Sequence, residues 1–278
     1  MLDDRMARRN RWLLFGLVTA ITLAVNLPII MMVMNAFQTT EQLVSRTTLL
    51  PRAPTLANFR YLNERTDFWR FLWNSVTVSG ASTLASVAVA TLAGYALSRF
   101  RGRLITVYAR SLFLVQMFPI ILALIPLFIL FRGLGLINSP LSVIIVYTVV
   151  NLPFATWMAR AFFETIPREL EDAALVDGCS RFGAFVRIVL PLSGPGLAAI
   201  AIFSFLFSYN EFFVANVFLK DQDAMTLPVG ITMFMQQYST DWGSLMAAAT
   251  MTVIPTFILF LCVQRWISYG AVSGGVKG

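Results

Sequence analysis

The acidic side chains that could bind a partner gather in one short stretch between two apolar runs. Glu169, Glu171 and Asp172 stand close together, and Asp177 and Gly178 follow them. Acids in the first turns of a helix are stabilised by the helix dipole, and a glycine after a helix permits the left-handed backbone with which many helices end. The pattern predicts a short helix that projects carboxylates and small side chains from the surface.

The residue types that are missing exclude several classes of enzyme. The chain has no His, which excludes histidine-based triads, imidazole metal sites and zincins. Cys179 and Cys262 are too far apart for a CxxC motif or a zinc knuckle. Neither Lys220 nor Lys277 precedes Ser or Thr, so a Walker A phosphate loop is excluded as well. We therefore predict a chain that is not an enzyme and binds no metal or cofactor itself.

The composition indicates a membrane protein. Hydrophobic residues make up 58% of the 278 residues and charged residues 13%, against about 45–50% and about 25% in soluble domains. The net charge is +7, and the basic side chains form short clusters between apolar runs. Such clusters favour contact with anionic membrane lipid and argue against a nucleic-acid partner.

Six apolar stretches are long enough to cross a bilayer, for which a helix needs about 20 residues. They are Trp12–Met34, Leu72–Leu97, Ser111–Phe131, Leu141–Ala159, Pro195–Leu219 and Gly243–Gln264. The sequence therefore predicts an all-α, polytopic membrane protein with six transmembrane helices and one domain, 1–278. The spacing of Ser82, Ser86, Ala90 and Gly94 along the second stretch predicts close helix packing, which is expected within the bundle in preference to a subunit interface.

The distribution of basic residues predicts the orientation. The first stretch is too long for the core of a signal peptide, so we expect it to be a retained anchor. With six spans, both termini lie on one side, which carries fourteen basic residues against seven on the other. Because positive charge accumulates in cytoplasmic loops, both termini are predicted to be cytoplasmic.

The acidic stretch is predicted to fold as two short helices. Thr165 is a candidate cap for the first helix, and Gly178 is suited to the turn after it. Ser180 is expected to cap a second helix, Arg181–Leu190, which Pro191 is expected to stop.

Eleven residues of this loop carry a family resemblance. They are Glu171-Asp172-Ala173-Ala174-Leu175-Val176-Asp177-Gly178, followed by Ile188 and Leu190-Pro191. The loop resembles the EAA loop of ABC importer permeases, whose pattern is Glu-Ala-Ala, three residues, Gly and, about ten residues later, Ile-x-Leu-Pro. In this alignment Asp172 replaces the first Ala of the pattern.

A second resemblance lies near the C-terminus. It is carried by Met235–Tyr238, Asp241–Gly243, Gln264–Trp266 and Ser273–Gly278. These residues resemble the smaller membrane subunit of maltose-type sugar importers. The likeness covers the chain in topology and is strongest from Ile166 onward.

The resemblance implies a mechanism and a set of partners. The EAA loop, 166–191, would be the coupling helix that docks on an ATPase subunit, where Glu171 would pair with a basic group. The residues implied at this contact are Glu171, Asp172, Ala173, Ala174, Asp177, Gly178, Leu190 and Pro191. The partners implied are a homologous second permease, two ATPase subunits, which would bind ATP and Mg²⁺, and an extracytoplasmic solute-binding protein.

Two further contacts are implied by the resemblance. In the external loop, Gln236, Gln237 and Tyr238 would contact the binding protein, although the loop could equally be a solvated connector. The cytoplasmic tail, 268–278, would reach the ATPase dimer through Gly274, Gly275 and Lys277. Its glycine content is otherwise typical of a flexible tail.

Polar residues inside the apolar stretches are candidates for a substrate path. Glu211 and Asn210 lie in the fifth stretch, where an acid must face a cavity or a partner. They could bind sugar hydroxyls, or Glu211 could be a structural residue paired to another helix or to another subunit. Gln116 and Asn151 are further candidates, and Tyr209 could stack on a sugar ring.

Together with the six apolar stretches, the resemblance implies a membrane subunit of a binding-protein-dependent ABC importer for sugars, in the inner membrane of a bacterium. The main alternative is an importer of the same build for a polyol, a glycerol phosphate or an amino acid. An ion-coupled secondary transporter would use Glu211 as its ion site but would not need the EAA loop. The sequence does not identify the sugar.

Overall fold

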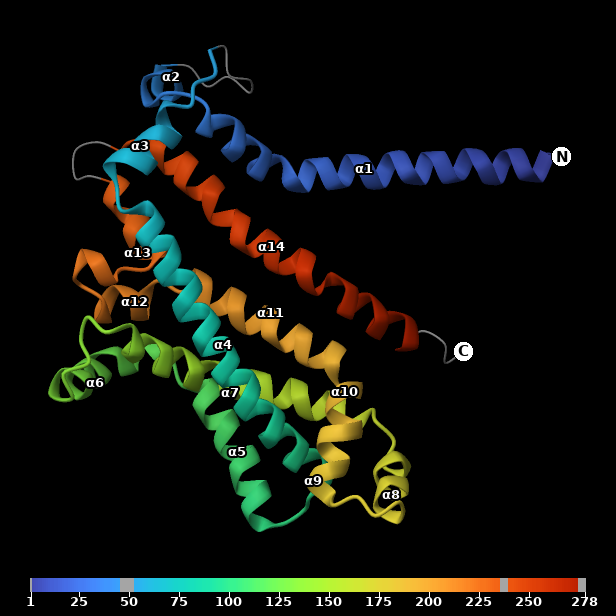
Figure 1. The fold of residues 1–278 in the computed structure, drawn as a ribbon. Helices are drawn as coiled ribbons and strands as arrows, with labels where there is room; N and C mark the ends of the chain where they lie inside the picture. Colours follow the sequence, from blue (N-terminus) through green and yellow to red (C-terminus); the bar gives the residue numbers. More distant parts are fainter. Residues whose placement is uncertain (1, 46–52, 236–239, 275–278) are drawn as a thin grey trace. The chain divides into compact units, whose positions relative to one another are not determined.

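A computed structural model describes residues 2–45, 53–235 and 240–274. Their helices, drawn in Figure 1, are α1 (Leu2–Ala36), α2 (Thr40–Ser45), α3 (Ala57–Arg65), α4 (Phe68–Arg99), α5 (Arg103–Met117), α6 (Ile120–Gly133), α7 (Pro140–Glu164), α8 (Glu169–Val176), α9 (Arg181–Ala184), α10 (Leu190–Leu192), α11 (Gly194–Asn210), α12 (Phe213–Phe218), α13 (Leu227–Ile231) and α14 (Trp242–Gly274). A π-helical stretch, Phe185–Val189, joins α9 to α10, and two short 3₁₀ turns span Gln222–Ala224 and Thr232–Phe234. The described residues form no β-strand, only one isolated bridge between Met235 and Thr240.

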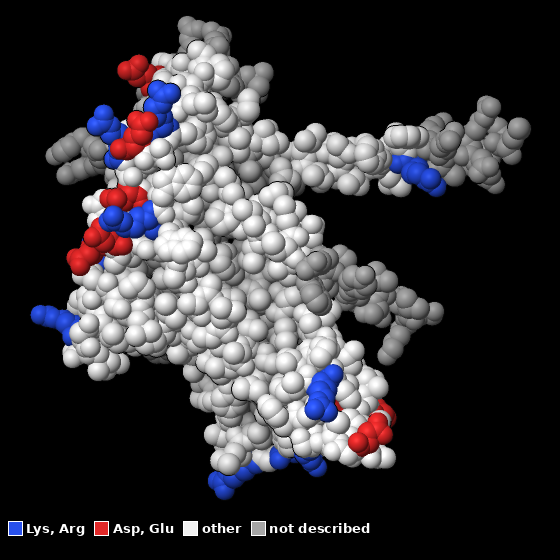
Figure 2. Space-filling view, viewed as in Figure 1, with Lys and Arg blue, Asp and Glu red and all other residues white. Residues whose placement is uncertain are grey.

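The apolar helices agree with the predicted all-α membrane fold. Four of them are long and apolar enough to cross a membrane, namely α4, α7, the part of α1 from Arg11 and the part of α14 up to Gln264. Two further spans would each be a bent pair, α5 with α6 and Arg181–Leu192 with α11, which brings the number to six. Charged side chains are few on the face shown in Figure 2, where they form small separate groups.

Two predicted spans are not single straight helices. The stretch predicted at 111–131 is divided between α5 and α6, which meet at 98°. Pro119, which has no N–H and an extended backbone, begins α6 and ends the hydrogen-bond ladder of α5. The stretch predicted at 195–219 also breaks, because α11 ends at Asn210 and the backbone at Glu211 is extended.

By its internal contacts the chain divides into two units. The larger unit, 69–232 with 254–278, packs around α7, which contacts α5, α11 and α12. The polar stripe on α4 lies inside this unit: Ser82, Ser86 and Ala90 are fully buried. A Cβ atom on Gly94 would lie 2.6 Å from the Cβ of Ala159, so the glycine permits a close crossing of α4 and α7. The predicted close packing within the bundle is therefore confirmed.

The smaller unit, 1–68 with 233–253, joins α2 and α3 to the start of α14. The buried Asn58 side chain donates to the carbonyls of Ala36 and Gln38, both at 2.8 Å. The Asp241 carboxylate accepts a 2.6 Å hydrogen bond from the Thr40 hydroxyl and another from the Ser244 N–H. Burial raises the pKa of Asp241, but hydrogen bonds from Ser244 and Thr40 outweigh burial and hold this pKa below its ordinary value.

Candidate functional site

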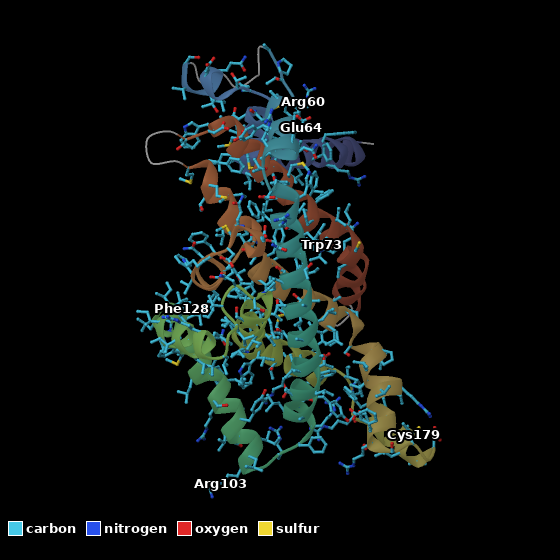
Figure 3. The ribbon with its side chains drawn as sticks, turned by 60° about the vertical axis from the view of Figure 1, so that its left-hand side comes forward. Arg60, Glu64, Trp73, Arg103, Phe128 and Cys179 are labelled. Atoms are coloured by element: carbon cyan, nitrogen blue, oxygen red, sulfur yellow. The ribbon has the colours of Figure 1, made fainter. Side chains whose placement is uncertain are left out.

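The EAA-like loop, 166–191, contains the predicted turn between two helices. After α8, Gly178 has a φ of 86°, a left-handed conformation that glycine adopts without a steric penalty. Ser180 then caps α9, because its Oγ accepts the N–H of Gly183 at 3.0 Å. Figure 3 labels Cys179, which lies in the turn between Gly178 and Ser180. The predicted roles of the glycine and of the serine are confirmed.

The predicted outer limits of the loop helices are wrong. Thr165 lies at the C-terminal end of α7 instead of capping α8, and its N–H bonds the Phe162 carbonyl. Pro191 does not stop the second helix, because the chain stays helical through Leu192. The π-helical stretch before α10 shifts the hydrogen-bond register, and Pro191 then occupies the first turn of α10, where its missing N–H has no consequence.

Glu171 points into its own chain. Its Oε1 atom accepts from Nε of Arg99 at 2.5 Å, and its Oε2 atom accepts from the Tyr95 hydroxyl at 2.6 Å. The side chains of Arg99 and Glu171 are only 8% and 12% exposed. The base that neutralises Glu171 in this structure therefore belongs to α4, whereas the resemblance implied a basic group of an ATPase.

Asp172 is the acid on the outer side of α8. It is exposed, and so are Ala173 and Asp177, whereas Ala174 is buried. Counting back from Gly178 over three residues and two alanines also leads to Asp172 as the acid of the Glu-Ala-Ala pattern. The register with Glu171 as the acid was therefore offset by one residue, and Asp172 replaces the glutamate of the pattern instead of its first alanine.

The far end of the loop is partly accessible. Leu190 is half-buried and Pro191 is exposed, whereas the neighbouring Val189 is fully buried. Val189 and Phe185 belong to an apolar cluster with Ala159 and Phe163 of α7. The second half of the loop is therefore anchored in the bundle through the π-helical stretch.

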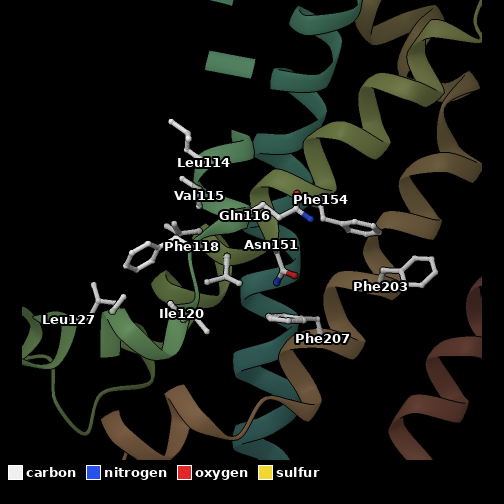
Figure 4. Close-up of a pocket in the computed structure, with 13 residues that line it drawn as sticks. Leu114, Val115, Gln116, Phe118, Ile120, Leu127, Asn151, Phe154, Phe203 and Phe207 are labelled. Carbon is white, nitrogen blue, oxygen red and sulfur yellow. The ribbon is translucent and has the colours of Figure 1, made fainter. Parts of the chain in front are cut away.

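A cavity of about 870 Å³ lies in the larger unit, beside the break between α5 and α6. It is lined mainly by apolar and aromatic side chains, including Phe118, Phe154, Phe203 and Phe207 (Figure 4). Its volume is in the range of about 300–1,000 Å³ that is usual for ligand sites. Sequence reasoning did not single out these four phenylalanines, because aromatic residues are frequent throughout the chain.

Two of the predicted path residues, Gln116 and Asn151, line this cavity. Asn151 is 5% exposed, and its Nδ2 donates to the Ser208 hydroxyl at 3.0 Å. The Ser208 hydroxyl in turn accepts from Ser82 of α4 at 3.1 Å. This chain of hydrogen bonds orients the Asn151 amide at the cavity wall.

The other three path candidates do not line the cavity. Glu211 caps α12, where its carboxylate accepts the N–H groups of Phe213 and Val214 and the hydroxyl of Tyr147. Asn210 donates to the Leu206 carbonyl of its own helix, and Tyr209 is buried against Phe205. This geometry favours the structural interpretation of Glu211.

The remaining predicted contacts lie at the edges of the described chain. Gln236, Gln237 and Tyr238 are outside the described residues, as are Gly275 and Lys277. Gly274 is the last residue of α14, which extends ten residues beyond the span predicted to end at Gln264. The first part of the predicted tail, 268–274, is therefore helical.

Comparisons with known proteins agree with this architecture. Residues 86–270, which include the whole EAA-like loop, match the family described as "Binding-protein-dependent transport system inner membrane component". The sulfoquinovosyl glycerol transport system permease protein SmoH of Agrobacterium fabrum is 36% identical over 252 residues, which cover 90% of this chain and 88% of SmoH. The maltose/maltodextrin transport system permease protein MalG of Escherichia coli is 38% identical over 214 residues, which cover 75% of this chain and 72% of MalG.

A solved structure shows the same fold. It is a bacterial ABC transporter involved in the import of the acidic polysaccharide alginate, and it matches with a TM-score of 0.76 at 21% sequence identity. The match covers 95% of this chain and 97% of that chain.

Proposed function

The chain belongs to the family of binding-protein-dependent transport system inner membrane components, and from this premise we propose that it is one of two permease subunits of an ATP-driven importer of carbohydrates. Permeases of this family are transport subunits and not enzymes. Chemical energy would come from ATP and Mg²⁺ bound by a separate pair of ATPase subunits. The relatives that transport sulfoquinovosyl glycerol and maltose or maltodextrin support carbohydrate as the substrate class.

The observation that carries the coupling role is the outward face of α8. Asp172 and Ala173 are exposed next to the left-handed turn at Gly178. A carboxylate beside a small side chain suits close docking against a groove that holds a basic residue. Glu171 would not take part directly, since Arg99 and Tyr95 already bind it.

The cavity supports a path for a sugar. Aromatic rings provide flat apolar surface for the C–H faces of a sugar ring, and Gln116 and Asn151 provide hydrogen-bonding groups for its hydroxyls. An ion-coupled mechanism through Glu211 has less support, because backbone N–H groups and Tyr147 already bind this carboxylate.

The proposed orientation follows the basic residues. Both termini and the EAA-like loop would face the cytoplasm. Gln236, Gln237 and Tyr238 would then lie outside, where they could contact the solute-binding protein, and the tail with Gly274, Gly275 and Lys277 could reach the ATPase. Labelling of Cys179 by a membrane-impermeant thiol reagent in inverted vesicles, but not in intact cells, would support this orientation.

The substrate class is tested on the solute-binding protein that operates with this permease. Its thermal unfolding is measured with a panel of mono-, di- and oligosaccharides, polyols, glycerol phosphates and amino acids. A stabilisation by carbohydrate alone supports the proposal. A stabilisation by amino acids or glycerol phosphates alone would refute carbohydrate as the substrate class while leaving the architecture unchanged.

The cavity is tested by paired asparagine variants in the assembled transporter. Asn151→Ala removes an amide from the cavity wall and is expected to lower the rate of solute uptake. Asn210→Ala, which removes an amide outside the cavity, serves as the control. An uptake rate that depends on Asn210 and not on Asn151 would contradict the proposed path.

A further inference from the structure

The last turn of α4 is bonded to the EAA-like loop at several points. Arg99 forms the ion pair with Glu171 and also donates from its NH2 group to the Ile166 carbonyl at 3.0 Å. In the opposite direction, Arg168 donates to the Ser98 carbonyl of α4 at 3.0 Å. The loop is therefore held to α4 both before α8 and within it.

Tyr95 extends this attachment into the apolar core. Its ring lies 4.5 Å from that of Phe185, in the π-helical stretch after α9, and 5.8 Å from that of Phe163, in α7. Its hydroxyl meanwhile donates to Glu171. One side chain of α4 thus contacts both halves of the loop, so that α8 cannot shift relative to α4 without breaking a charge-assisted hydrogen bond.

The opposite end of α4 is bonded to a different segment, 223–230. Asn74 donates from Nδ2 to the carbonyls of Asp223 and Met225, both at 2.9 Å. Ser75 accepts the N–H of Leu227 at 2.7 Å. These contacts tie the first turns of α4 to the start of α13 (Figure 1).

Between these two attachments α4 is a continuous helix. It has no internal proline, whereas α1, α7 and α14 contain Pro28, Pro153 and Pro255. Proline is one common cause of sharp kinks in helices, and α4 contains none; it does contain a Ser79–Gly80 pair, another kind of kink site. The helix nevertheless runs without a break from Phe68 to Arg99. The close contact of Gly94 with Ala159 supports the helix from the side of α7.

We propose that α4 is a connecting rod that carries movement of the EAA-like loop across the membrane to segment 223–230, with the Arg99–Glu171 ion pair as its joint. This inference rests on the proposed function, because it takes the loop as the part that an ATPase moves. Arg99 and Glu171 are positioning residues in this scheme, since neither has to touch ATP or solute.

The test measures solute uptake per ATP hydrolysed in the complex of this chain with its second permease, ATPase and binding protein. Arg99→Gln and Glu171→Gln are each expected to lower this ratio about tenfold, within the usual range of coupling between sites. The charge-reversed pair, Arg99→Glu with Glu171→Arg, is expected to restore part of it. Arg160→Gln is the control, because Arg160 and Glu164 form an ion pair one turn apart within α7 and join no separate segments.

A distance measurement distinguishes transmission of movement by α4 from an ion pair, Arg99–Glu171, that only stabilises the fold. The native cysteines Cys179 and Cys262 are first replaced by Ser. One spin label is then placed on α8 at position 176, where Val176 is 87% exposed, and a second at position 221, next to segment 223–230. If α4 joins the two segments, their separation is constant through the ATP cycle in the otherwise unchanged chain. In Arg99→Gln it is expected to vary with nucleotide.

The outcomes distinguish the two proposals. A wild-type complex without ATP-dependent uptake would overturn the proposed function and the rod with it. Normal ATP-dependent uptake together with an unchanged ratio in Arg99→Gln would overturn the rod alone. A label separation that varies with nucleotide in the unchanged chain would also overturn it.

Discussion

Two carboxylates in the larger unit, Glu171 and Glu211, are satisfied in different ways. Glu171 faces a guanidinium, that of Arg99, which is 72 residues away in the sequence. Glu211 accepts backbone N–H groups from the helix that follows it, together with the Tyr147 hydroxyl. None of the ion pairs among the described residues includes Glu211.

The difference separates a joint from a local cap. An ion pair between distant segments makes them move together, and loss of either partner destabilises the fold because the remaining charge is buried without compensation. A carboxylate that binds N–H dipoles at a helix start mainly fixes where the chain breaks, here between α11 and α12. The same residue type therefore connects segments in one region and shapes the backbone in the other.

The largest effect is expected from removal of one charge at the joint. Arg99→Ala leaves the Glu171 carboxylate buried without its base and is expected to lower the free energy of unfolding by about 3–5 kcal/mol. Arg99→Ala combined with Glu171→Ala is expected to cost less than the sum of the single variants. Chemical denaturation in detergent measures all three, with Arg160→Ala and Glu164→Ala as the matched pair on α7, expected to couple by only about 0.5 kcal/mol. Strictly additive effects at Arg99 and Glu171 would contradict a joint.

A smaller loss of stability is expected when Glu211, which caps α12, is replaced. Glu211→Ala removes the acceptor of several N–H groups at the start of α12 and is expected to lower the free energy of unfolding by about 2 kcal/mol. Glu211→Gln keeps one acceptor oxygen and is expected to cost about half as much, roughly 1 kcal/mol. The same denaturation assay applies. Equal losses in the two variants would show that charge, and not capping, is what matters at Glu211.

The two tyrosines that donate to these carboxylates offer a finer comparison. Tyr147→Phe keeps the buried ring and removes one hydrogen bond to Glu211, which is expected to cost about 1 kcal/mol. Tyr95→Phe is expected to cost less, because Arg99 still neutralises Glu171. Thermal unfolding of both variants measures which substitution destabilises the protein more. A larger loss in Tyr95→Phe would mean that the hydroxyl, rather than the guanidinium, holds Glu171.

The smallest effect concerns a third carboxylate, Asp241, held by neutral donors in the smaller unit. Its folded pKa is lowered, so its stabilising contribution is present above the pKa of the unfolded chain. As pH falls through the ordinary Asp value of about 3.9 and then through the lower folded pKa, the contribution is lost. Fluorescence of the adjacent Trp242 is expected to report a local loosening over this acidic range, and Asp241→Asn is expected to remove the transition. An identical transition in Asp241→Asn would assign it to another group.

Local signals in the sequence predicted most of the fold. Apolar length located the six spanning regions, and the turn at Gly178 and the cap at Ser180 followed from the conformations that those residues favour. The break at Pro119 was missed, because a proline inside an apolar run more often kinks a helix than ends it. The bend of 98° depends on packing with α7 and α12, which the sequence does not display.

The candidate site was less predictable than the fold. The pattern around Gly178 located the loop, but the direction of Glu171 depends on Arg99 and Tyr95, which lie 72 and 76 residues away. The cavity was equally hard to predict, because its phenylalanines come from two separate helices, α7 and α11, and from the break between α5 and α6. Glu211 was ambiguous for a different reason: an acid in an apolar run predicts a buried partner and does not reveal that backbone N–H groups supply it.

The length of α4 turns small rotations into large displacements. The helix between Ser75 and Arg99 rises about 36 Å at the usual 1.5 Å per residue. A tilt of about 10° over that length would move one end by about 6 Å relative to the other, roughly the pitch of one helical turn. The angle between α4 and its neighbours is therefore a sensitive coordinate for this chain, and two states that look nearly alike at Gly94 would differ by about 5 Å at Ser75 after the same tilt.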